Sequence, residues 1–450
     1  MSRRLPAPSF SDWVARVPAE WEVERLGNVA EIMFSNVDKH TIEGEVPVRL
    51  CNYVDVYKND RITGAINFME ASADAHEIAR FQIHREDVLA TKDSETPDDI
   101  AISSLVTEDL PMVLCGYHLA LIRPRRHRAH GPYLAWLHAS KGFRAQYEAQ
   151  AVGITRFGLS QAAFKEARVP LPSLPEQQRI AEYLDASCAA LDAAVATKCR
   201  QLKTLESLQK SIIQSAVTEG IDGTVEFRES GTALLAKLPI GWRLLRLKYI
   251  ADIRYGLGQP PAEKDAGVPM IRATDIDAGR ILEENLLFVD PDGLPPGRNP
   301  YLKEGEIVVV RSGVYTGDSA IVPTRLAGAV AGYDMVVTVK KAVPEFVGYS
   351  LLSEYVLESQ LLLLTLRAAQ PHLNAQELGG IVLALPESRQ EQEAICAYLD
   401  EKVGEVKGIA ASIKAQIATL QAYRESMIHE CVTGQRRIME PDLSRVYAHG

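Results

Sequence analysis

Two long segments of the chain place an apolar residue at alternating steps of four and three positions. The first stripe runs from Leu184 to Ala216 and is interrupted only by Lys198 and Gln209, and the second runs from Leu399 to Cys431 with one polar residue. A sustained repeat of about 3.5 residues predicts two long helices that pair as a coiled coil. The stripe residues expected at the contact are Leu184, Leu191, Val195, Leu202, Leu205, Ile212, Leu399, Val403, Val406, Ile413, Ile417, Leu420 and Met427.

The alternative is that each helix simply lies on a globular core. Charged residues throughout the faces outside the stripe favour the coiled coil instead. Because each helix follows its own globular part, antiparallel pairing is the simplest closed arrangement. At a rise of about 1.5 Å per residue each stripe spans roughly 50 Å, so the pair could act as a spacer.

The rest of the chain also repeats itself. Residues 17–32 recur as residues 238–253, and residues 180–185 recur as residues 395–400. Such a duplication implies two copies of one globular domain. In each copy, short apolar runs bounded by turn residues predict strands, with helices after them. The expected strands are at residues 46–50, 87–91, 112–122 and 169–172, and at residues 268–272, 306–310, 334–340 and 381–386.

The predicted fold is therefore α+β, with two globular domains separated by an antiparallel coiled coil and related by an internal pseudo-two-fold repeat. Its expected parts are residues 1–172 (first globular domain), 173–222 (first spacer helix), 223–386 (second globular domain), 387–438 (second spacer helix) and 439–450 (C-terminal tail).

Composition narrows the functional classes. The 450 residues include no apolar run long enough for a membrane helix or a signal peptide, so we expect a cytoplasmic protein. The six cysteines form no Cys-x-x-Cys pair and no zinc spacing, and we expect reduced thiols, mostly small buried side chains, and no metal. A net charge of −10 argues against a general nucleic-acid coat protein.

The chain lacks the motifs of common catalysts. It contains no Gly-x-x-x-x-Gly-Lys-Ser/Thr loop, no His-Glu-x-x-His and no Gly-x-Ser-x-Gly. We therefore expect a non-catalytic protein that binds no cofactor itself.

Candidate recognition residues lie in loops at matching places in the two halves. Their side chains can bond base edges or phosphates, although each alone could equally be an ordinary loop or capping residue. The arginine cluster at residues 123–128 could contact phosphates or be a solvated loop. The candidates are Asn52, Tyr53, Lys58, Thr91, Lys92, Ser94, Arg123, Arg125, Arg126, Arg156, Thr274, Arg311, Ser312, Tyr315, Thr316, Gln370, His372 and Asn374.

One repeated motif resembles a known family. Leu174-Pro-Glu-Gln leads into a helix that ends in Val217-Thr-Glu-Gly, and Leu385-Pro-Glu leads into a helix that ends in Val432-Thr-Gly. This pattern, present twice, closely resembles the specificity subunit of type I restriction-modification systems. The second copy has additional residues between Leu385-Pro-Glu and Gln392, so the sequence defines the start of its helix only to within one turn.

The resemblance implies a function. Each globular domain would be a target-recognition domain that reads one half of a split, asymmetric site in double-stranded DNA, and the helices would set the gap. Two modification (methyltransferase) subunits and restriction (motor-nuclease) subunits would dock on the chain and carry S-adenosylmethionine, ATP and Mg. Residues 91–98 differ from their counterparts 310–317, so the two domains should read different sequences. The alternative is a two-headed protein–protein adaptor with a coiled-coil spacer.

Overall fold

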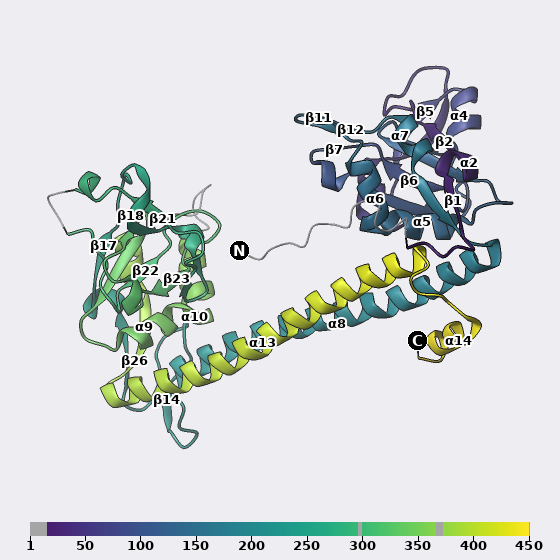
Figure 1. Ribbon diagram of the computed structural model, residues 1–450. Helices are drawn as coiled ribbons and strands as arrows, with labels where there is room; N and C mark the ends of the chain where they lie inside the picture. The colour runs from purple at the N-terminus through teal and green to yellow at the C-terminus, as the bar shows by residue number, and fades with distance from the viewer. Residues whose placement is uncertain (1–15, 296–298, 366–371, 450) are drawn as a thin grey trace. The chain divides into compact units, whose positions relative to one another are not determined.

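The computed structural model describes residues 16–295, 299–365 and 372–449 (Figure 1). The chain divides into two compact units, residues 1–198 with 415–450 (unit 1) and residues 199–414 (unit 2). Each unit holds one globular part and a portion of both long helices. We call residues 16–172 head 1 and residues 223–386 head 2.

The long helices are α8 (Leu174–Glu219) and α13 (Arg389–Val432). Every stripe residue predicted from the heptads is buried or half-buried. In unit 1, Leu184 and Cys188 share a core with Met427 and Cys431. In unit 2, Ile213 and Ala216 share a core with Leu399 and Val403. Later residues of one helix thus meet earlier residues of the other, which confirms the antiparallel pairing.

Lys198 is one of the polar interruptions of the first stripe. Its Nζ donates a hydrogen bond of 2.5 Å to Gln416 Oε1 on the facing helix. The glutamine oxygen gives the lysine ammonium a hydrogen-bond acceptor, which apolar seam residues could not provide. Such polar pairs can fix the register of the two helices.

Head 1 is a mixed α+β domain. Its strands are β1 (Glu22–Arg25), β2 (Ala30–Phe34), β3 (Val46–Cys51), β4 (Arg61–Ile62), β5 (Met69–Ala73), β6 (Val88–Thr91), β7 (Asp93–Ser94), β8 (Ser103–Val106), β9 (Val113–Cys115), β10 (Leu119–Pro124), β11 (Val152–Gly153), β12 (Phe157–Gly158) and β13 (Arg168–Leu171). Its helices are α2 (Leu26–Val29), α3 (Tyr53–Lys58), α4 (Ala75–Phe81), α5 (Gly131–Ala139), α6 (Lys141–Glu148) and α7 (Gln161–Glu166), with a 3₁₀ turn at Pro97–Asp99.

Head 2 is built in the same way. Its strands are β14 (Phe227–Glu229), β15 (Lys237–Pro239), β16 (Trp242–Arg246), β17 (Ala251–Tyr255), β18 (Glu263–Ile271), β19 (Ile276–Asp277), β20 (Arg280–Ile281), β21 (Leu287–Val289), β22 (Ile307–Val309), β23 (Ser319–Ile321), β24 (Val330–Ala331), β25 (Met335–Val339) and β26 (Val382–Pro386). Its helices are α9 (Pro344–Leu351), α10 (Glu354–Val356), α11 (Leu362–Thr365) and α12 (Ala375–Gly380), with a π-helical turn at Leu357–Leu361 and 3₁₀ turns at Leu247–Tyr249, Ala273–Asp275, Pro291–Gly293 and Thr324–Leu326.

The two heads share one sheet topology. The order β2-β10-β6-β8 in head 1 corresponds to β17-β25-β22-β23 in head 2, and β5-β3-β9 corresponds to β21-β18-β24. The parallel pair β3 and β9 has its counterpart in the parallel pair β18 and β24. The predicted α+β class and internal repeat are therefore confirmed.

The sequence missed several local features. The apolar run at residues 112–122 is not one strand, because it breaks between β9 and β10 at the turn of residues 116–118. A Cβ on Gly116 would lie 2.8 Å from Asn52 Oδ1, so this turn requires glycine. Helices α3, α4, α7 and α12 were not expected, since each is too short for a clear helical period. The segment predicted as a C-terminal tail contains helix α14 (Glu440–His449).

A buried glutamine joins each head to its long helix. Gln177 accepts from the His130 N–H at 2.9 Å and donates to the Pro172 carbonyl at 2.9 Å. Gln392 accepts from the Val343 N–H and donates to the Pro386 carbonyl, both at 2.8 Å. Gln392 is thus the structural counterpart of Gln177, and the two helices start at equivalent points despite the inserted residues.

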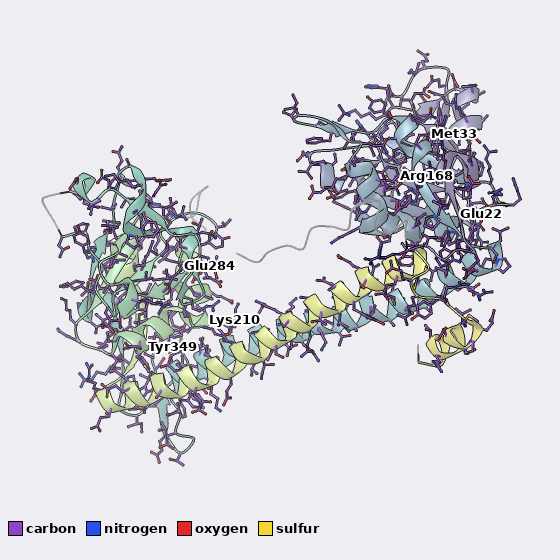
Figure 2. The ribbon with its side chains drawn as sticks, viewed as in Figure 1. Glu22, Met33, Arg168, Lys210, Glu284 and Tyr349 are labelled. Atoms are coloured by element: carbon purple, nitrogen blue, oxygen red, sulfur yellow. The ribbon has the colours of Figure 1, made fainter. Side chains whose placement is uncertain are left out.

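The repeated Tyr-Leu-Asp motif makes a second joint. In unit 1 the Trp136 indole N–H donates to Asp185 at 2.7 Å, and in unit 2 the Tyr349 hydroxyl donates to Asp400 at 2.6 Å. Tyr349 is labelled in Figure 2, on helix α9 of head 2. A motif that appears in the sequence as a simple repeat therefore supplies the acceptor that holds each head to its helix. Among the described residues no helix is long and apolar enough to cross a membrane.

Candidate functional site

The candidate residues of head 1 gather at one end of its central sheet, where strand β6 ends. Lys92 follows this strand, and its backbone N–H donates to the carbonyl of His118 at 3.2 Å. Its own carbonyl accepts from the Leu159 N–H at 2.8 Å. The turn between β9 and β10 and the segment after β12 therefore fix the backbone of Lys92 from two sides.

The side chain of Lys92 lies between two aromatic rings. Its Nζ is 5.1 Å from the ring centroid of Phe34 and 4.9 Å from that of Tyr117. It donates to the Ser35 carbonyl at 3.4 Å. Burial lowers the pKa of Lys92 while nearby Asp93 acts in the opposite direction. The ammonium group is therefore held by two ring faces and a backbone carbonyl.

A charged cluster lies beside this lysine. Asp93 accepts from Arg156 Nη2 at 2.5 Å and lies 2.8 Å from His118 Nδ1. Arg156 remains more than half exposed, with 59% of its side chain accessible. The structure thus brings together Lys92 and Arg156, which the sequence had placed in separate loops.

A hollow of about 560 Å³ opens next to Tyr117 and His118. Asn52 and Tyr53 also line it, at the start of helix α3. The Tyr53 ring stacks on Tyr57 with centroids 5.5 Å apart. Lys58 is the exposed last residue of the same helix. The hollow offers amide, phenol and imidazole groups, a set suited to hydrogen bonding with a polar ligand.

Two predicted contact residues of head 1 instead serve the fold. Thr91 is fully buried, and its hydroxyl accepts from the Ile102 N–H at 3.1 Å. Ser94 is 5% exposed and accepts from the Thr96 N–H at 3.3 Å. Both side chains face inward and hold the loop after β6, so they are corrected to structural residues.

The arginine cluster lies at the opposite end of the sheet. Strand β10 pairs antiparallel with β6, so Arg123 lies about five residues, or roughly 17 Å, along the strands from Lys92. Arg123 donates to the buried Asp87 carboxylate through Nε at 3.0 Å and Nη2 at 2.8 Å, which makes it structural. Arg125 and Arg126 are exposed. They lie away from the Lys92 cluster, and phosphate contact remains a prediction for them.

In head 2, Arg311 is placed between two tyrosines. Its Cζ is 4.6 Å from the ring centroid of Tyr255 and 4.3 Å from that of Tyr333. Its Nη2 is 2.9 Å from His372 Nε2. The Arg311 N–H donates to Asp334 Oδ1 at 3.2 Å. The guanidinium is thus fixed in space by two ring faces and an imidazole.

The loop after Arg311 has a defined shape. Gly313 and Gly317 have φ of 90° and 94°, a region that strongly favours glycine. Ser312 forms a β-bridge with His372, and the Thr316 hydroxyl donates to the Gly313 carbonyl at 2.6 Å. Tyr315 is exposed at the surface of this loop. Asp318 accepts from the backbone N–H groups of Ala278 and Ser319, at 3.2 and 2.8 Å.

The remaining candidates of head 2 are dispersed. Asn374 is the N-cap of helix α12 and accepts from the N–H groups of Gln376 and Glu377, both at 2.9 Å, so its side chain is corrected to a structural one. Thr274 is exposed in the turn after β18. Gln370 lies outside the described residues.

The aromatic residues that hold the two cations were not among the predicted site residues. Phe34 and Tyr255 end strands β2 and β17, while Tyr117 and Tyr333 each follow a glycine in the turn before β10 and β25. A residue-by-residue alignment of the two halves would have shown an aromatic side chain at both places. What could not be read from either half alone is that these rings converge on the cation.

The comparisons with known proteins give one answer. Residues 18–203 match the family model described as Type I restriction modification DNA specificity domain. The chain is 21% identical to the type I restriction enzyme MjaVIII specificity subunit of Methanocaldococcus jannaschii, with 94% of each chain covered. It is 24% identical to the EcoBI specificity subunit of Escherichia coli, with 68% of this chain and 67% of that one covered.

Solved structures agree in fold. The HsdS subunit from Thermoanaerobacter tengcongensis matches with a TM-score of 0.52 at 19% identity, covering 93% of this chain and 98% of its own. A chain from a study of complex assembly and conformational transition of the type I R-M system matches with a TM-score of 0.72 at 19% identity, covering 92% of this chain and 98% of its own. The resemblance predicted from the repeated motif is thereby confirmed.

Proposed function

We propose that this chain, whose residues 18–203 match the type I restriction modification DNA specificity domain model, is the sequence-specific DNA recognition subunit of a type I restriction-modification complex. Each head reads one half of a bipartite, asymmetric site. The observation that carries this proposal is the duplication of one scaffold with different side chains at the same place. Lys92 and Asp93 follow strand β6 in head 1, whereas Arg311 and Ser312 follow strand β22 in head 2.

The paired helices act as the spacer and as the platform for partners. Every predicted stripe residue is buried or half-buried, so within each unit the pair is a well-packed element. A rigid element between two readers fixes the number of base pairs between the half-sites. Two modification subunits and the restriction subunits assemble on this chain, and S-adenosylmethionine, ATP and Mg belong to those subunits. The complex is cytoplasmic, where the DNA is.

The chain itself performs no catalysis in this proposal. Its net charge of −10 also means that the chain alone should bind DNA weakly, because phosphate contacts need cations. Partner subunits supply the remaining positive charge and the methyl transfer. A subunit that recognises the DNA sequence and leaves methyl transfer to its partners fits both the lack of catalytic motifs and the negative net charge.

The test is reconstitution. The purified chain, the cognate modification subunit and S-adenosylmethionine are combined with DNA, and methylated adenines are mapped. We expect methylation at one split motif only when both proteins are present, and no methylation, ATP hydrolysis or cleavage by the chain alone. Methylation without this chain, or a motif without a gap, would refute the proposal. The capture of proteins but not DNA by the assembled complex would favour the adaptor alternative.

A further inference from the structure

Lys92 and Arg311 occupy the same position in the two heads. Each follows the central strand, β6 or β22, which pairs with the equivalent strand β10 or β25. The carbonyl of Lys92 accepts from Leu159, and the carbonyl of Arg311 accepts from Leu373, both at 2.8 Å. These leucines lie just before the N-caps of the equivalent helices α7 and α12. The backbone therefore holds both cations in one way.

The rings around the two cations are equivalent as well. Phe34 and Tyr255 are the last residues of the equivalent strands β2 and β17. Tyr117 and Tyr333 come from the equivalent turns before β10 and β25. We call each arrangement an aromatic clamp, composed of Phe34, Tyr117 and Lys92 in head 1, and of Tyr255, Tyr333 and Arg311 in head 2. The clamp is retained although both the cation and one ring differ between the heads.

A clamp of this kind is poorly explained as a device for stability alone. Arg311 Nε is buried and has no hydrogen-bond partner among the described residues. Lys92 Nζ contacts ring faces and one carbonyl, with a distance of 3.4 Å to the latter. A long cationic side chain normally loses much rotamer freedom when it binds a ligand. Aromatic rings that hold the cationic side chain before the ligand binds reduce this entropy cost and so favour binding.

We propose that Lys92 and Arg311 are equivalent base-reading residues, each of which contacts the O6 and N7 edge of a guanine in its own half-site. This inference rests on the proposed function. Arginine and lysine are the side chains that bond this guanine edge in the major groove, and the arginine contact can be bidentate. The rings aim the cation, so Phe34, Tyr117, Tyr255 and Tyr333 are positioning residues.

The surroundings of the clamps explain how equivalent readers serve different half-sites. Beside Lys92 lie Asp93, His118 and Arg156, joined by contacts of 2.5 and 2.8 Å. Beside Arg311 lie Asp334 and His372. One guanine would be read in each half-site by the clamp, and the neighbouring bases by groups that differ between the heads.

The experiment maps adenine methylation by the complex assembled with its modification subunits, for the wild-type chain, Lys92→Ala and Arg311→Ala. We expect each variant to lose preference at a single G·C pair by roughly 10-fold to 100-fold. The affected pair should lie in one half-site for Lys92→Ala and in the other for Arg311→Ala. Arg85→Ala is the matched control, because this exposed arginine precedes strand β6, at the end of the strand opposite to Lys92, and should leave sequence preference unchanged.

Ring variants separate aiming from folding. Tyr333→Phe keeps the ring and should keep the preference, whereas Tyr333→Leu should relax the same position as Arg311→Ala. Melting temperatures identify variants that are merely unstable, and Arg311→Lys and Lys92→Arg replace any alanine variant that does not fold. Lysine at 311 should weaken the preference less than alanine does.

The outcomes are distinct. Uniformly weaker binding with less salt dependence would mean phosphate contact and would overturn the inference. Unchanged motifs, or changes by both variants in the same half-site, would also overturn it. If the wild-type complex yields no split motif, the proposed function itself is wrong. If it yields a split motif that neither substitution changes, only the base-reading role of Lys92 and Arg311 is wrong.

Discussion

The two heads share a scaffold and differ in the chemistry that the scaffold presents. Head 1 surrounds its clamped cation with a carboxylate, an imidazole and a second cation, Asp93, His118 and Arg156. Head 2 surrounds its clamped cation with an imidazole and a buried carboxylate, His372 and Asp334. The joints between head and helix, in contrast, are nearly the same. Positions that hold the architecture were retained after duplication, while positions around the clamps diverged.

The largest effect is expected from lengthening the spacer, which tests whether the heads read independently. Seven residues inserted after Lys198 and again after Ala415 preserve the heptads at facing positions and lengthen each helix by about 10 Å. Both half-sites should stay the same while the preferred gap grows by about three base pairs, at 3.4 Å each. Methylome mapping measures this. The same insertion in one helix alone should abolish methylation, and an unchanged gap would mean that the helices are not the spacer.

The second-largest effect is expected from replacing the two buried glutamines, each of which connects a head to its long helix. Gln177→Ala removes bonds to the His130 N–H and to the carbonyls of Pro172 and Arg128, at 2.9, 2.9 and 3.1 Å. Gln392→Ala removes two comparable bonds. Buried backbone groups left unpaired should destabilise unit 1 by about 3–5 kcal/mol and unit 2 somewhat less.

Hydrogen exchange measured on each variant locates the loss. Protection should fall in the unit that carries the substitution and be retained in the other. A glutamine variant without effect on its own unit would show that the two joints are not equivalent.

A smaller effect is expected at the Tyr-Leu-Asp motif. Asp185→Ala leaves the buried Trp136 indole N–H and the Arg61 guanidinium without their acceptor, since both contact this carboxylate. Asp400→Ala leaves the Tyr349 hydroxyl without its acceptor. We expect losses of about 1–3 kcal/mol for Asp185→Ala and about 1 kcal/mol for Asp400→Ala in chemical unfolding. The reverse order would contradict the assigned contacts.

The smallest effect distinguishes the heads by pH. Burial raises the pKa of Asp334 to about 6 from its usual 3.8. Between these values the folded state holds more protons than the unfolded state, so this group lowers stability as the pH rises from about 4 to 6. Asp334→Asn should therefore stabilise head 2, but only by about 0.5–1 kcal/mol at pH 7.5, because the amide also loses the attraction between the carboxylate and Arg311.

The advantage of Asp334→Asn should shrink as the pH falls towards 4 and disappear near pH 3, below both pKa values, where the carboxyl is mostly protonated in both states. Thermal unfolding at the two pH values tests this. An advantage that is independent of pH would point to packing, because the titration of the carboxyl would then play no part.

The sequence by itself determined the periodic features. Heptads specify paired helices because a 3.5-residue period leaves one continuous apolar seam, and every predicted stripe residue is buried or half-buried. Duplication specified a repeated α+β head, since two segments with the same pattern must bury the same faces. The repeated motif also carried the resemblance to type I specificity subunits, and its glutamine and aspartate form the joints between head and helix.

Only the tertiary structure decided which loop residues form a site. Thr91 and Ser94 had the right side chains for contact but point inward, and Asn374 caps a helix. In the sequence, Lys92 and Arg311 look like other loop cations. In the fold, strand β2 and the turn before β10 place Phe34 and Tyr117 beside Lys92. The equivalent elements of head 2 place Tyr255 and Tyr333 beside Arg311. Periodicity records which face is buried, whereas a clamp assembled from three distant segments depends on strand order, which local pattern does not encode.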